Sequence, residues 1–373
     1  MKDVNCSESP QTIKIIKNRG PITGLIAGVL GTLKVIFPSP IKEWINLIEK
    51  DVLDEEFSGS LSLYEKLEAY LLGFTSSEYC WYGIDQGVNP DLYISEFLRI
   101  AYTECINEDP DILNNKKRFH EYMDTKGFSE YLPKIIGSID SGLVNGEDEI
   151  IDILNKEKKI VLKPYYGGGG HGVYICTKND QRIEINGNLV DNFDFHFNNY
   201  IITKYIDQAS FLDKIYPHSA NTVRLLVINP QGKKPFICRS VLRIGTNKTG
   251  GLDNRNKGGL FSKIDLESGD LYPAAETLPS GKIRWHEKHP ETKTKIEGFS
   301  IPGWNKFKEK ILKIIDQLPK FKCVGWDILL KDNNKFVIIE GNSKPVPIVW
   351  QVYEPLLENN RIKKFYKDNG VPV

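Results

Sequence analysis

The sequence has little that would recruit nucleic acid, form disulfides or bind a metal through cysteine. Its 49 basic and 49 acidic residues balance, so no global charge attracts nucleic acid. The six cysteines lie far apart, with no CxxC pair and no metal-ligand spacing. We therefore expect a cytoplasmic protein that has reduced, mostly buried thiols and does not bind nucleic acid.

No uninterrupted apolar run reaches the roughly 20 residues that a membrane span needs. The segment "GPITGLIAGVLGTLKVIFPSP" comes nearest, but it is glycine-rich and Lys34 interrupts it. The polar start "MKDVNCSESPQ" leads us to expect no cleavable signal peptide. Because the basic "KIIKNR" precedes the apolar segment, two alternatives stay open for residues 12–40: a packed or interfacial helix, and peripheral contact with the inner face of a membrane.

The sequence also lacks the usual signatures of phosphate-binding loops and of nucleophilic catalysis. It has no GxxxxGK[ST] motif, and its glycine run does not lead into a helix as a dinucleotide fingerprint would. No Ser-His-Asp or Cys-His arrangement stands out either. These absences favour chemistry that needs no protein nucleophile.

What the sequence has instead is the stretch "VLKPYYGGGGHGVYIC", residues 161–176. The flanking runs "KIVLK" and "GVYIC" are rich in β-branched and aromatic residues, which predicts a strand, a tight glycine turn and a second strand. Backbone N–H groups in such a turn can form a nest for phosphate oxygens, and Lys163 adds a positive charge. A glycine-rich hairpin without a ligand is the alternative that this stretch alone leaves open.

The pattern of apolar residues changes along the chain of 373 residues, which is long enough for two or three domains. Up to about residue 110, segments such as "SLSLYEKLEAYLLGF" and "DLYISEFLRIAYTECI" have helical spacing, and "NNKKRFHEYMDTKGF" predicts a further helix capped by Asn114 or Asn115. From Ile160 onward short strands dominate, with the amphipathic "PGWNKFKEKILKIIDQL" before the last two. We expect four segments: 1–110, mainly helical; 111–206, with the glycine loop; 207–350; and a helical tail, 351–373.

The hairpin "WDILLKDNNKFVIIEGN" carries two carboxylates in apolar surroundings. A two-residue turn at Asn333-Asn334 would place Asp327 opposite Glu340, with Asn342 on the same face as Glu340. Opposed like charges destabilise a sheet, and an unpaired charge among apolar neighbours is costly. A divalent cation would relieve both problems, and these three residues offer the hard oxygen ligands that suit Mg²⁺. A surface-facing pair bridged by lysines is the alternative.

Several motifs occur here in the order that is typical of one group of enzymes. The chain resembles the ATP-grasp superfamily, and more closely its sugar-transfer-associated branch from bacterial polysaccharide and teichuronopeptide gene clusters. The similarity spans roughly residues 112 to 347, and its motifs are "NNKKRFHEYMDTKGF", "LKPYYGGGGHGV", "IITKYIDQ", "NTVRLLVI", "GGLDNRNKGGLFSKIDLESGDL", "HPETKTKIEGFSIPGW" and "VGWDILL…KFVIIEGNSKP".

This resemblance implies an α+β fold in which two subdomains with antiparallel sheets clasp ATP, preceded by a helical N-terminal region. It implies ATP and Mg²⁺ as cofactors. Lys116 would reach the nucleotide phosphates, Lys163 would bridge phosphate and base, and Arg224 would stabilise charge on the transferring phosphoryl group, a task that suits a guanidinium better than an ammonium. A flexible cover over the phosphates would consist of Gly167, Gly168, Gly169, Gly170, His171 and Gly172.

The resemblance also assigns a hinge and a set of substrate-side residues. Lys204, Tyr205 and Ile206 match the hinge whose backbone reads the adenine edge. Thr203-Lys204 stands where many ATP-grasp enzymes have acidic residues, a change that backbone recognition tolerates. The substrate-side features are Asn221 and Thr222, which touch substrate or hold a turn; Asp253 and Asn254, in a glycine-flanked loop; and His289, which binds substrate or a loop.

The function that this resemblance implies is ATP-dependent carboxylate–amine ligation through an acyl phosphate. The substrates would be a sugar acid, nucleotide-linked or glycan-linked, and an amine or amino acid, in the synthesis of capsule or another surface glycan. Two rivals stay open. One is a kinase that phosphorylates a hydroxyl, and the other is a nucleotide-responsive scaffold in a glycan assembly complex.

Overall fold

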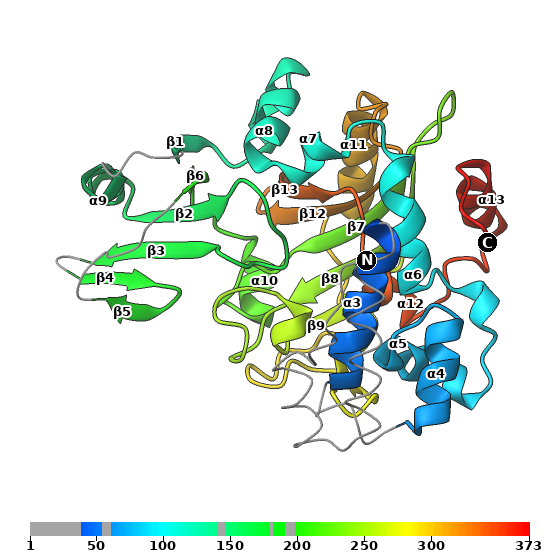
Figure 1. Cartoon of the computed structure of the whole chain (residues 1–373). Coiled ribbons are helices and arrows are strands. Elements are labelled where there is room, and N and C mark those ends of the chain that lie inside the picture. Colours follow the sequence, from blue (N-terminus) through cyan, green and yellow to red (C-terminus); the bar gives the residue numbers. More distant parts are fainter. Residues whose placement is uncertain (1–38, 54–60, 141–145, 180–181, 191–197) are drawn as a thin grey trace, which may run out of the picture. The chain divides into compact units, whose positions relative to one another are not determined.

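The computed structural model describes residues 39–53, 61–140, 146–179, 182–190 and 198–373 (Figure 1). Most of residues 12–40, for which a packed or interfacial helix and membrane contact were the two alternatives, therefore lies outside the described residues. Among those that are described, no helix is long and apolar enough to cross a membrane. The chain forms two compact units: a first unit of Met1–Thr103, Leu278–Ile283 and Glu354–Val373, and a second of Glu104–Thr277 and Arg284–Tyr353.

The first unit is helical, as the N-terminal pattern predicted. Two of its helices begin at capping boxes, in which Ser62 pairs with Glu65 and Thr75 with Glu78, so that orphan backbone N–H groups find partners. Among its described residues, this unit has the α-helices α3 (Ser39–Leu53), α4 (Leu63–Leu71), α5 (Ser76–Trp81), α6 (Glu96–Leu98) and α13 (Asn360–Asp368).

The segment 91–106, which has helical spacing, forms several short helices rather than one α-helix. A 3₁₀ turn at Pro90–Leu92 ends in the extended residue Tyr93. Ser95 then starts a new helix by accepting a hydrogen bond from the Leu98 N–H. After α6 the chain widens into a π-helix at Arg99–Thr103. The helical spacing was real, but a local cap divided it.

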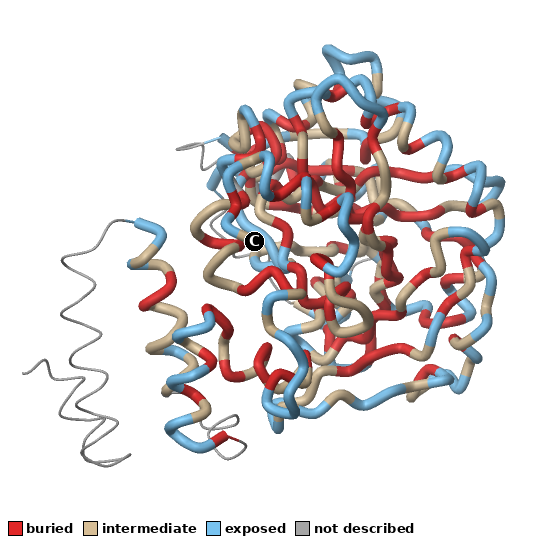
Figure 2. The backbone as a smooth tube through the Cα atoms, turned by 90° about the vertical axis from the view of Figure 1, so that its right-hand side faces the viewer, coloured by how far each residue is buried: buried red, intermediate tan, exposed pale blue. Residues whose placement is uncertain are grey.

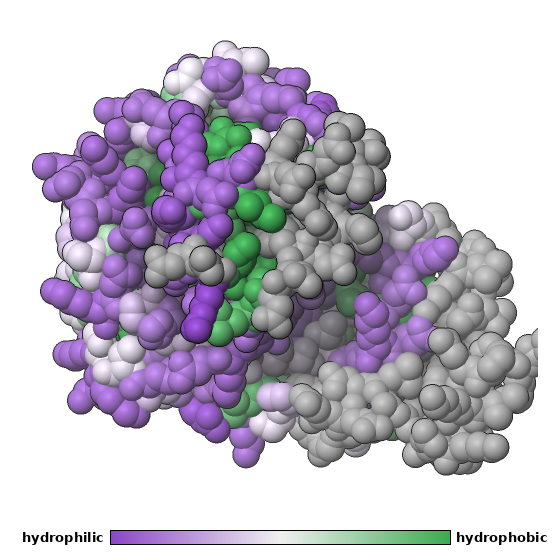
Figure 3. Space-filling view, turned by 90° about the vertical axis from the view of Figure 1, so that its left-hand side faces the viewer, coloured by the Kyte–Doolittle hydropathy of each residue, from purple (hydrophilic) through white to green (hydrophobic). Residues whose placement is uncertain are grey.

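The second unit contains two antiparallel sheets, which confirms the predicted α+β class. The smaller has six strands in the described part of the chain, in the order β1-β6-β2-β3-β4-β5, and α9 (Gly146–Glu157) packs on β2 and β3. Figure 3 faces the side of Figure 1 where this sheet lies and shows hydrophilic side chains over most of the described surface. Its strands are β1 (Ile135–Ile139), β2 (Lys159–Pro164), β3 (Tyr174–Asn179), β4 (Arg182–Ile185), β5 (Asn188–Val190) and β6 (Tyr200–Lys204).

The larger sheet has seven strands in the order β11-β10-β9-β8-β7-β12-β13. Eight consecutive residues of β12 are buried, and Figure 2 shows such continuous buried stretches as red runs in the interior. The strands are β7 (Val223–Ile228), β8 (Phe236–Ile244), β9 (Leu260–Lys263), β10 (Ala274–Thr277), β11 (Ile283–His286), β12 (Cys323–Lys331) and β13 (Lys335–Asn342).

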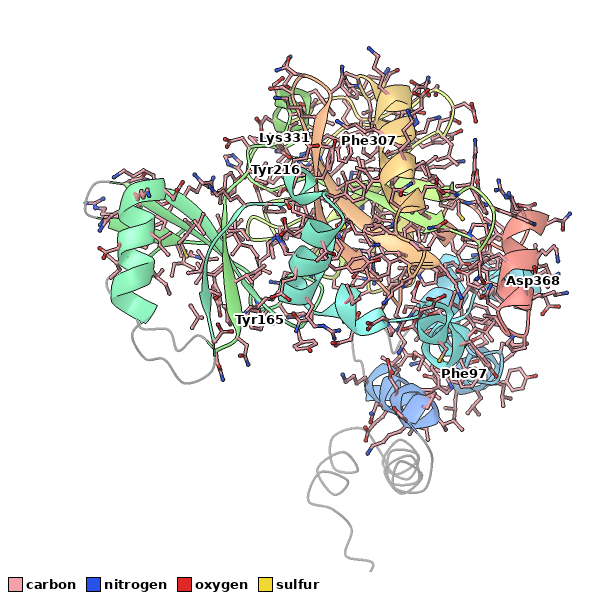
Figure 4. All side chains as sticks on the ribbon, turned by 90° about the horizontal axis from the view of Figure 1, so that it is seen from above. Phe97, Tyr165, Tyr216, Phe307, Lys331 and Asp368 are labelled. Carbon is pink, nitrogen blue, oxygen red and sulfur yellow. The ribbon has the colours of Figure 1, made fainter. Side chains whose placement is uncertain are left out.

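Helices of the second unit supply apolar side chains to the core of this larger sheet. The predicted amphipathic helix α11 (Trp304–Asp316) buries Trp304, Phe307 and Ile311 there; Figure 4 labels Phe307 on α11 and Lys331 at the end of β12. The other α-helices are α7 (Pro110–Asn114), α8 (Lys116–Thr125), α10 (Ser210–Ile215) and α12 (Ile348–Gln351). Asn115 caps α8 by accepting from the Arg118 N–H at 3.1 Å, as predicted for one of the two asparagines.

The β12–β13 hairpin pairs Asp327 with Glu340, as predicted, but by a different route. Lys331 pairs with Lys335, so three residues rather than two form the loop, with Asn333 and Asn334 at positive φ. That loop alone would shift the register by one residue. A bulge between Asp327 and Ile328 restores it, so that the two errors in the predicted register cancel at the carboxylates.

Candidate active site

A cavity of about 380 Å³ lies in the second unit, lined by residues from both of its sheets. Most of the predicted site residues line it: Lys116, Lys163, Gly168, Gly169, Gly170, Lys204, Tyr205, Ile206, Thr222, Arg224, Asp253, Asn254, Asp327, Glu340 and Asn342. Five others lie outside the lining: Gly167, His171, Gly172, Asn221 and His289. Chain segments far apart in the sequence thus converge on one cavity.

The glycine turn joins β2 to β3, and its backbone conformation explains its composition. Gly167, Gly169, Gly170 and Gly172 all have positive φ, between 64° and 118°, where a side chain is strained. A Cβ on Gly170 would also lie 2.6 Å from Leu252 Cδ1. Gly168 differs, because it has no positive φ and a Cβ there would meet nothing within 4 Å. Most of these positions therefore require glycine for conformational reasons.

Two lysines approach the turn from different elements. Lys116, the first residue of α8, donates from Nζ to the Gly167 carbonyl at 2.7 Å. Lys163, on β2, is buried, and burial lowers its pKa to about 8, although the charge of Glu340 opposes the shift. His120 follows Lys116 by one helical turn, and burial, helped by the charge of Lys163, lowers its pKa to about 4. The two lysines thus supply positive charge near the glycine turn, whereas His120 stays neutral near pH 7.

The predicted hinge lies where β6 ends. The Lys204 ammonium pairs with Glu157 on α9 at 2.8 Å, so its side chain is engaged with protein rather than free for a ligand. Lys159 Nζ lies 3.6 Å from the centroid of the Tyr205 ring. Both side chains thus have protein partners, which suits a hinge that would read a ligand through its backbone.

The opposed carboxylates on β12 and β13 lie among basic side chains. Asp327 Oδ2 is 3.4 Å from Arg224 Nη1 and 3.3 Å from Arg243 Nη1, and Glu340 Oε2 is 3.8 Å from Lys116 Nζ. The sequence analysis gave the relief of like-charge repulsion to a divalent cation, with a surface-facing pair bridged by lysines as the alternative. In the structure, protein cations already supply part of it.

Burial and charge act differently on the two carboxylates. Burial raises the pKa of Asp327 to about 6, although Arg224 and Arg243 lower it. Burial also raises the pKa of Glu340, but the positive charges of Lys116, Lys163 and Arg224 outweigh that effect and the net shift is downward. Glu340 is therefore the more firmly ionised of the pair.

The residues present fit a divalent cation. Asp327 Oδ1 is buried and has no hydrogen-bond partner among the described residues, so this oxygen is free to act as a metal ligand. The Asn342 amide donates to Asp327 Oδ2 at 3.3 Å, which brings the third proposed ligand next to the pair. No group of three His, Cys, Asp or Glu residues within the described ranges could hold a metal, so a site here depends on the asparagine oxygen and added ligands.

Arg243 is a cavity residue that sequence reasoning missed. It lies on β8, donates to Asp327, and pairs with Asp253 at 2.7 Å. A lone arginine in a strand gives little signal, although it interrupts an apolar run at a position that faces the site. The whole lining has an excess of positive charge suited to an anionic ligand, with Asp253, Asp327 and Glu340 set against Lys116, Lys163, Lys204, Arg224, Arg243 and Arg255.

Asn221 and His289 are both buried in a network around Gly245. Asn221 Oδ1 accepts from the Gly245 N–H at 3.0 Å, and His289 Nε2 lies 2.9 Å from the Gly245 carbonyl. Because that carbonyl can only accept, Nε2 carries the proton, and Nδ1 accepts from backbone N–H groups of residues 291 and 292. Of the alternatives for these residues, the geometry favours holding a turn and a loop.

A comparison with protein families shows to which family the chain belongs. The model of the sugar-transfer associated ATP-grasp family matches residues 98–365. The chain belongs to this family. A search of the curated proteins found no match.

Among solved structures, the fold of this ATP-grasp chain is similar to that of D-alanyl-alanine synthetase A from Vibrio cholerae O1 biovar eltor str. N16961, with 13% identity, 69% of this chain and 61% of that chain covered, and a TM-score of 0.38. It is also similar to the N5-carboxyaminoimidazole synthetase of Staphylococcus aureus complexed with ADP, with 14% identity, 66% and 51% coverage, and a TM-score of 0.35. The chain thus spans less than two thirds of the length of each.

Proposed function

We propose that this protein is an ATP-dependent ligase that joins a carboxylate to an amine through an acyl phosphate. Membership of an ATP-grasp family supports an enzyme that uses ATP. The observation that carries the proposal is one cavity that combines a glycine turn, buried basic side chains and an opposed carboxylate pair. A nucleoside triphosphate and its metal require all three kinds of group.

The cavity residues divide into roles along the length of a nucleotide. Tyr205, Ile206 and Lys163 all line the cavity; the hinge would read the base through its backbone, and Lys163 would bridge phosphate and base. Lys116 and the glycine turn enclose the phosphate chain. Arg224 would act on the group in transfer: it lines the cavity, its Nη1 reaches Asp327, and its buried Nε has no hydrogen-bond partner among the described residues.

Asp327, Glu340 and Asn342 would hold Mg²⁺, which when bound supplies charge neutralisation to the phosphates. The remaining catalysis consists of positioning and electrostatic stabilisation by side chains already in place. The Arg224 guanidinium would offset negative charge on the phosphoryl group as it moves. Arg243 would keep Asp327 ionised and oriented during that step.

The proposed reaction has two steps, phosphorylation of the carboxylate and formation of the amide. A substrate carboxylate oxygen attacks the γ-phosphorus of ATP, a bond forms to that oxygen, and the bond to ADP breaks. The amine then attacks the acyl carbon, the amide bond forms, inorganic phosphate leaves and the amine gives up a proton. No side chain of the protein is covalently modified in either step, in keeping with the lack of a nucleophilic triad.

The family description supports a substrate from sugar transfer. We propose a sugar acid, nucleotide-linked or glycan-linked, as the carboxylate and an amino acid or another amine as its partner, in bacterial surface-glycan synthesis. The protein would work in the cytoplasm, with residues 12–40 in peripheral contact with the membrane. The balanced charge gives no support to a nucleic-acid partner.

An ADP-release screen of acids crossed with amines, followed by mass spectrometry of the products, tests this function. Hydroxylamine should intercept the acyl phosphate as a hydroxamate, and full turnover should require both an acid and an amine. A stable phosphoester without amine dependence would replace the ligase by a hydroxyl kinase. Nucleotide binding without turnover under any combination would favour the scaffold.

A further inference from the structure

The glycine cover, residues 167–172, is fastened to the rest of the second unit at several points. Lys116 holds the Gly167 carbonyl, as described above. Asn254 donates from Nδ2 to the Gly169 carbonyl, and Leu252 packs where a Gly170 side chain would be. Two of the three contacts thus come from the β8–β9 loop, residues 245–259. This loop connects two strands of the larger sheet, whereas the glycine cover connects two strands of the smaller one.

The Asn254 side chain is oriented for this contact by its own surroundings. Its Oδ1 accepts from the Asn256 N–H at 2.9 Å, which leaves Nδ2 as the group directed at Gly169. Its backbone carbonyl accepts from the N–H groups of Lys257 and Gly259, both at 3.0 Å. The amide is therefore set in one orientation before any ligand enters.

The same loop is also joined to the carboxylate side of the cavity. Asp253, next to Asn254, pairs with Arg243 at 2.7 Å and accepts from the Thr222 N–H at 3.1 Å. Arg243 in turn lies 3.3 Å from Asp327. A continuous set of contacts therefore runs from Asp327 through Arg243 and Asp253 to Asn254 and the glycine cover.

We propose that Asn254 is a positioning residue that holds the glycine cover over the nucleotide phosphates. Through their contacts, Arg243 and Asp253 fix the position of Asn254 relative to Asp327. This inference rests on the proposed nucleotide site. Closing the cover fixes the Gly169 carbonyl to the loop, and the backbone N–H groups of the turn then stay directed at the phosphates. Loss of the Nδ2 donor leaves the turn intact but lets the cover open.

Hydrogen exchange of residues 166–172, measured with a non-hydrolysable ATP analogue and Mg²⁺, tests the proposal. Asn254→Asp removes the donor and keeps the acceptor to Asn256. In this variant exchange of the cover should be about fivefold to tenfold faster than in the wild type, and the analogue should bind more weakly by a similar factor. Exchange in β7 and β12 and the melting temperature should not change.

Asn247→Asp is the matched control, since it makes the same substitution at an exposed residue of the same loop. The Asn247 side-chain oxygen accepts a hydrogen bond from the Tyr216 hydroxyl at 3.0 Å, and a carboxylate oxygen can accept the same bond. It should behave as the wild type. Equal cover exchange in the Asn254 and Asn247 variants would overturn the proposal. A wild type that binds no adenine nucleotide would overturn the proposed function and this inference with it.

Asn254→Ser provides a second variant in case the added carboxylate disturbs folding. The hydroxyl can still accept from the Asn256 N–H in a short turn, but it lacks the length and the amide donor to reach Gly169. We expect the same faster exchange of the cover. If hydrogen exchange of the cover in a folded Asn254→Ser protein is as slow as in the wild type, the positioning role is refuted. The same result in the Asn254→Asp variant would refute it equally.

Discussion

The two walls of the cavity are built on different physical principles. The glycine wall consists of exposed backbone in left-handed conformations and is held by a few contacts to Lys116, Leu252 and Asn254. The hairpin wall consists of buried charges that restrain one another, with Asp327 held between two arginines. Backbone that is held by few contacts can respond to a ligand, whereas a buried ionic network is set before the ligand arrives.

This difference indicates a division of labour. In the proposed mechanism, recognition of the phosphates would fall to groups that move at little energetic expense, and stabilisation of transferring charge would fall to groups that need no reorganisation. Substitutions in the hairpin wall should therefore act on turnover, and those in the glycine wall on nucleotide affinity.

The largest effect should come from the hairpin wall. Glu340→Gln removes one charged metal ligand, and we expect Mg²⁺-dependent ATP turnover to fall by roughly a hundredfold or more while the fold stays intact. Turnover and circular dichroism of the purified variant measure both. Glu309→Gln, at an exposed position of α11, is the control and should keep wild-type turnover. Undiminished turnover in the folded Glu340 variant would refute the metal assignment.

Arg224→Lys should have the next largest effect and should sharpen the contrast between the walls. The substitution keeps the charge but loses the planar guanidinium, so the loss falls on the transition state. We expect kcat to fall by roughly tenfold to a hundredfold, with the KM for ATP changed by less than about threefold. Steady-state kinetics, with an acid and an amine that the enzyme accepts as substrates, measures kcat and the KM for ATP separately. A rise in KM alone would show that Arg224 serves binding only.

Much of the hairpin wall could be predicted from the sequence because its signals are local. Alternation places Asp327 and Glu340 on one face, and their apolar neighbours indicate burial; in the structure Asp327 is buried and Glu340 is partly buried. The bulge that restores the register could not be foreseen, since a bulge depends on contacts across the sheet. The prediction succeeded at the carboxylates because the loop length and the bulge compensate each other.

The connections between the walls could not be predicted, because they join residues that are distant in sequence. Nothing near Arg243 in the sequence indicates Asp253 or Asp327 as its partners. In the same way, the fourfold glycine run predicted a bare turn but not the Leu252 side chain that occupies the space beside Gly170. Asn221 and His289 matched motifs, yet their position outside the cavity lining depends on how the loop at Gly245 folds.

The glycine wall has its own matched test. Gly170→Ala introduces a Cβ 2.6 Å from Leu252 Cδ1 at a residue with a φ of 73°, so we expect about tenfold weaker binding of an ATP analogue, from strain of about 1–2 kcal/mol. Gly168→Ala adds the same methyl group where no atom lies within 4 Å, and it should bind nearly as the wild type. Titration calorimetry compares the two. Equal weakening would mean that the glycines serve flexibility alone.

The smallest effect concerns His120, a residue of α8 that is influenced by the charge of Lys163. Burial keeps its pKa near about 4 in the folded chain, below the ordinary value of 6.5, so folding favours the neutral ring. This histidine's contribution to stability is complete above pH 6.5 and is lost as the pH falls toward 4, because the unfolded chain takes up the proton first.

Between pH 7 and pH 5.5 the free energy of unfolding should therefore decrease by about 1 kcal/mol through this residue. His120→Gln has no proton to gain, so its urea-unfolding free energy should decrease less over that interval, and the difference between the two proteins isolates the histidine from the other titrating groups. His218→Gln, at an exposed histidine of the same unit, should retain the wild-type slope. If the unfolding free energy of the His120 variant depends on pH as strongly as that of the wild type, then the His120 ring is in contact with solvent in the folded chain and burial does not lower its pKa.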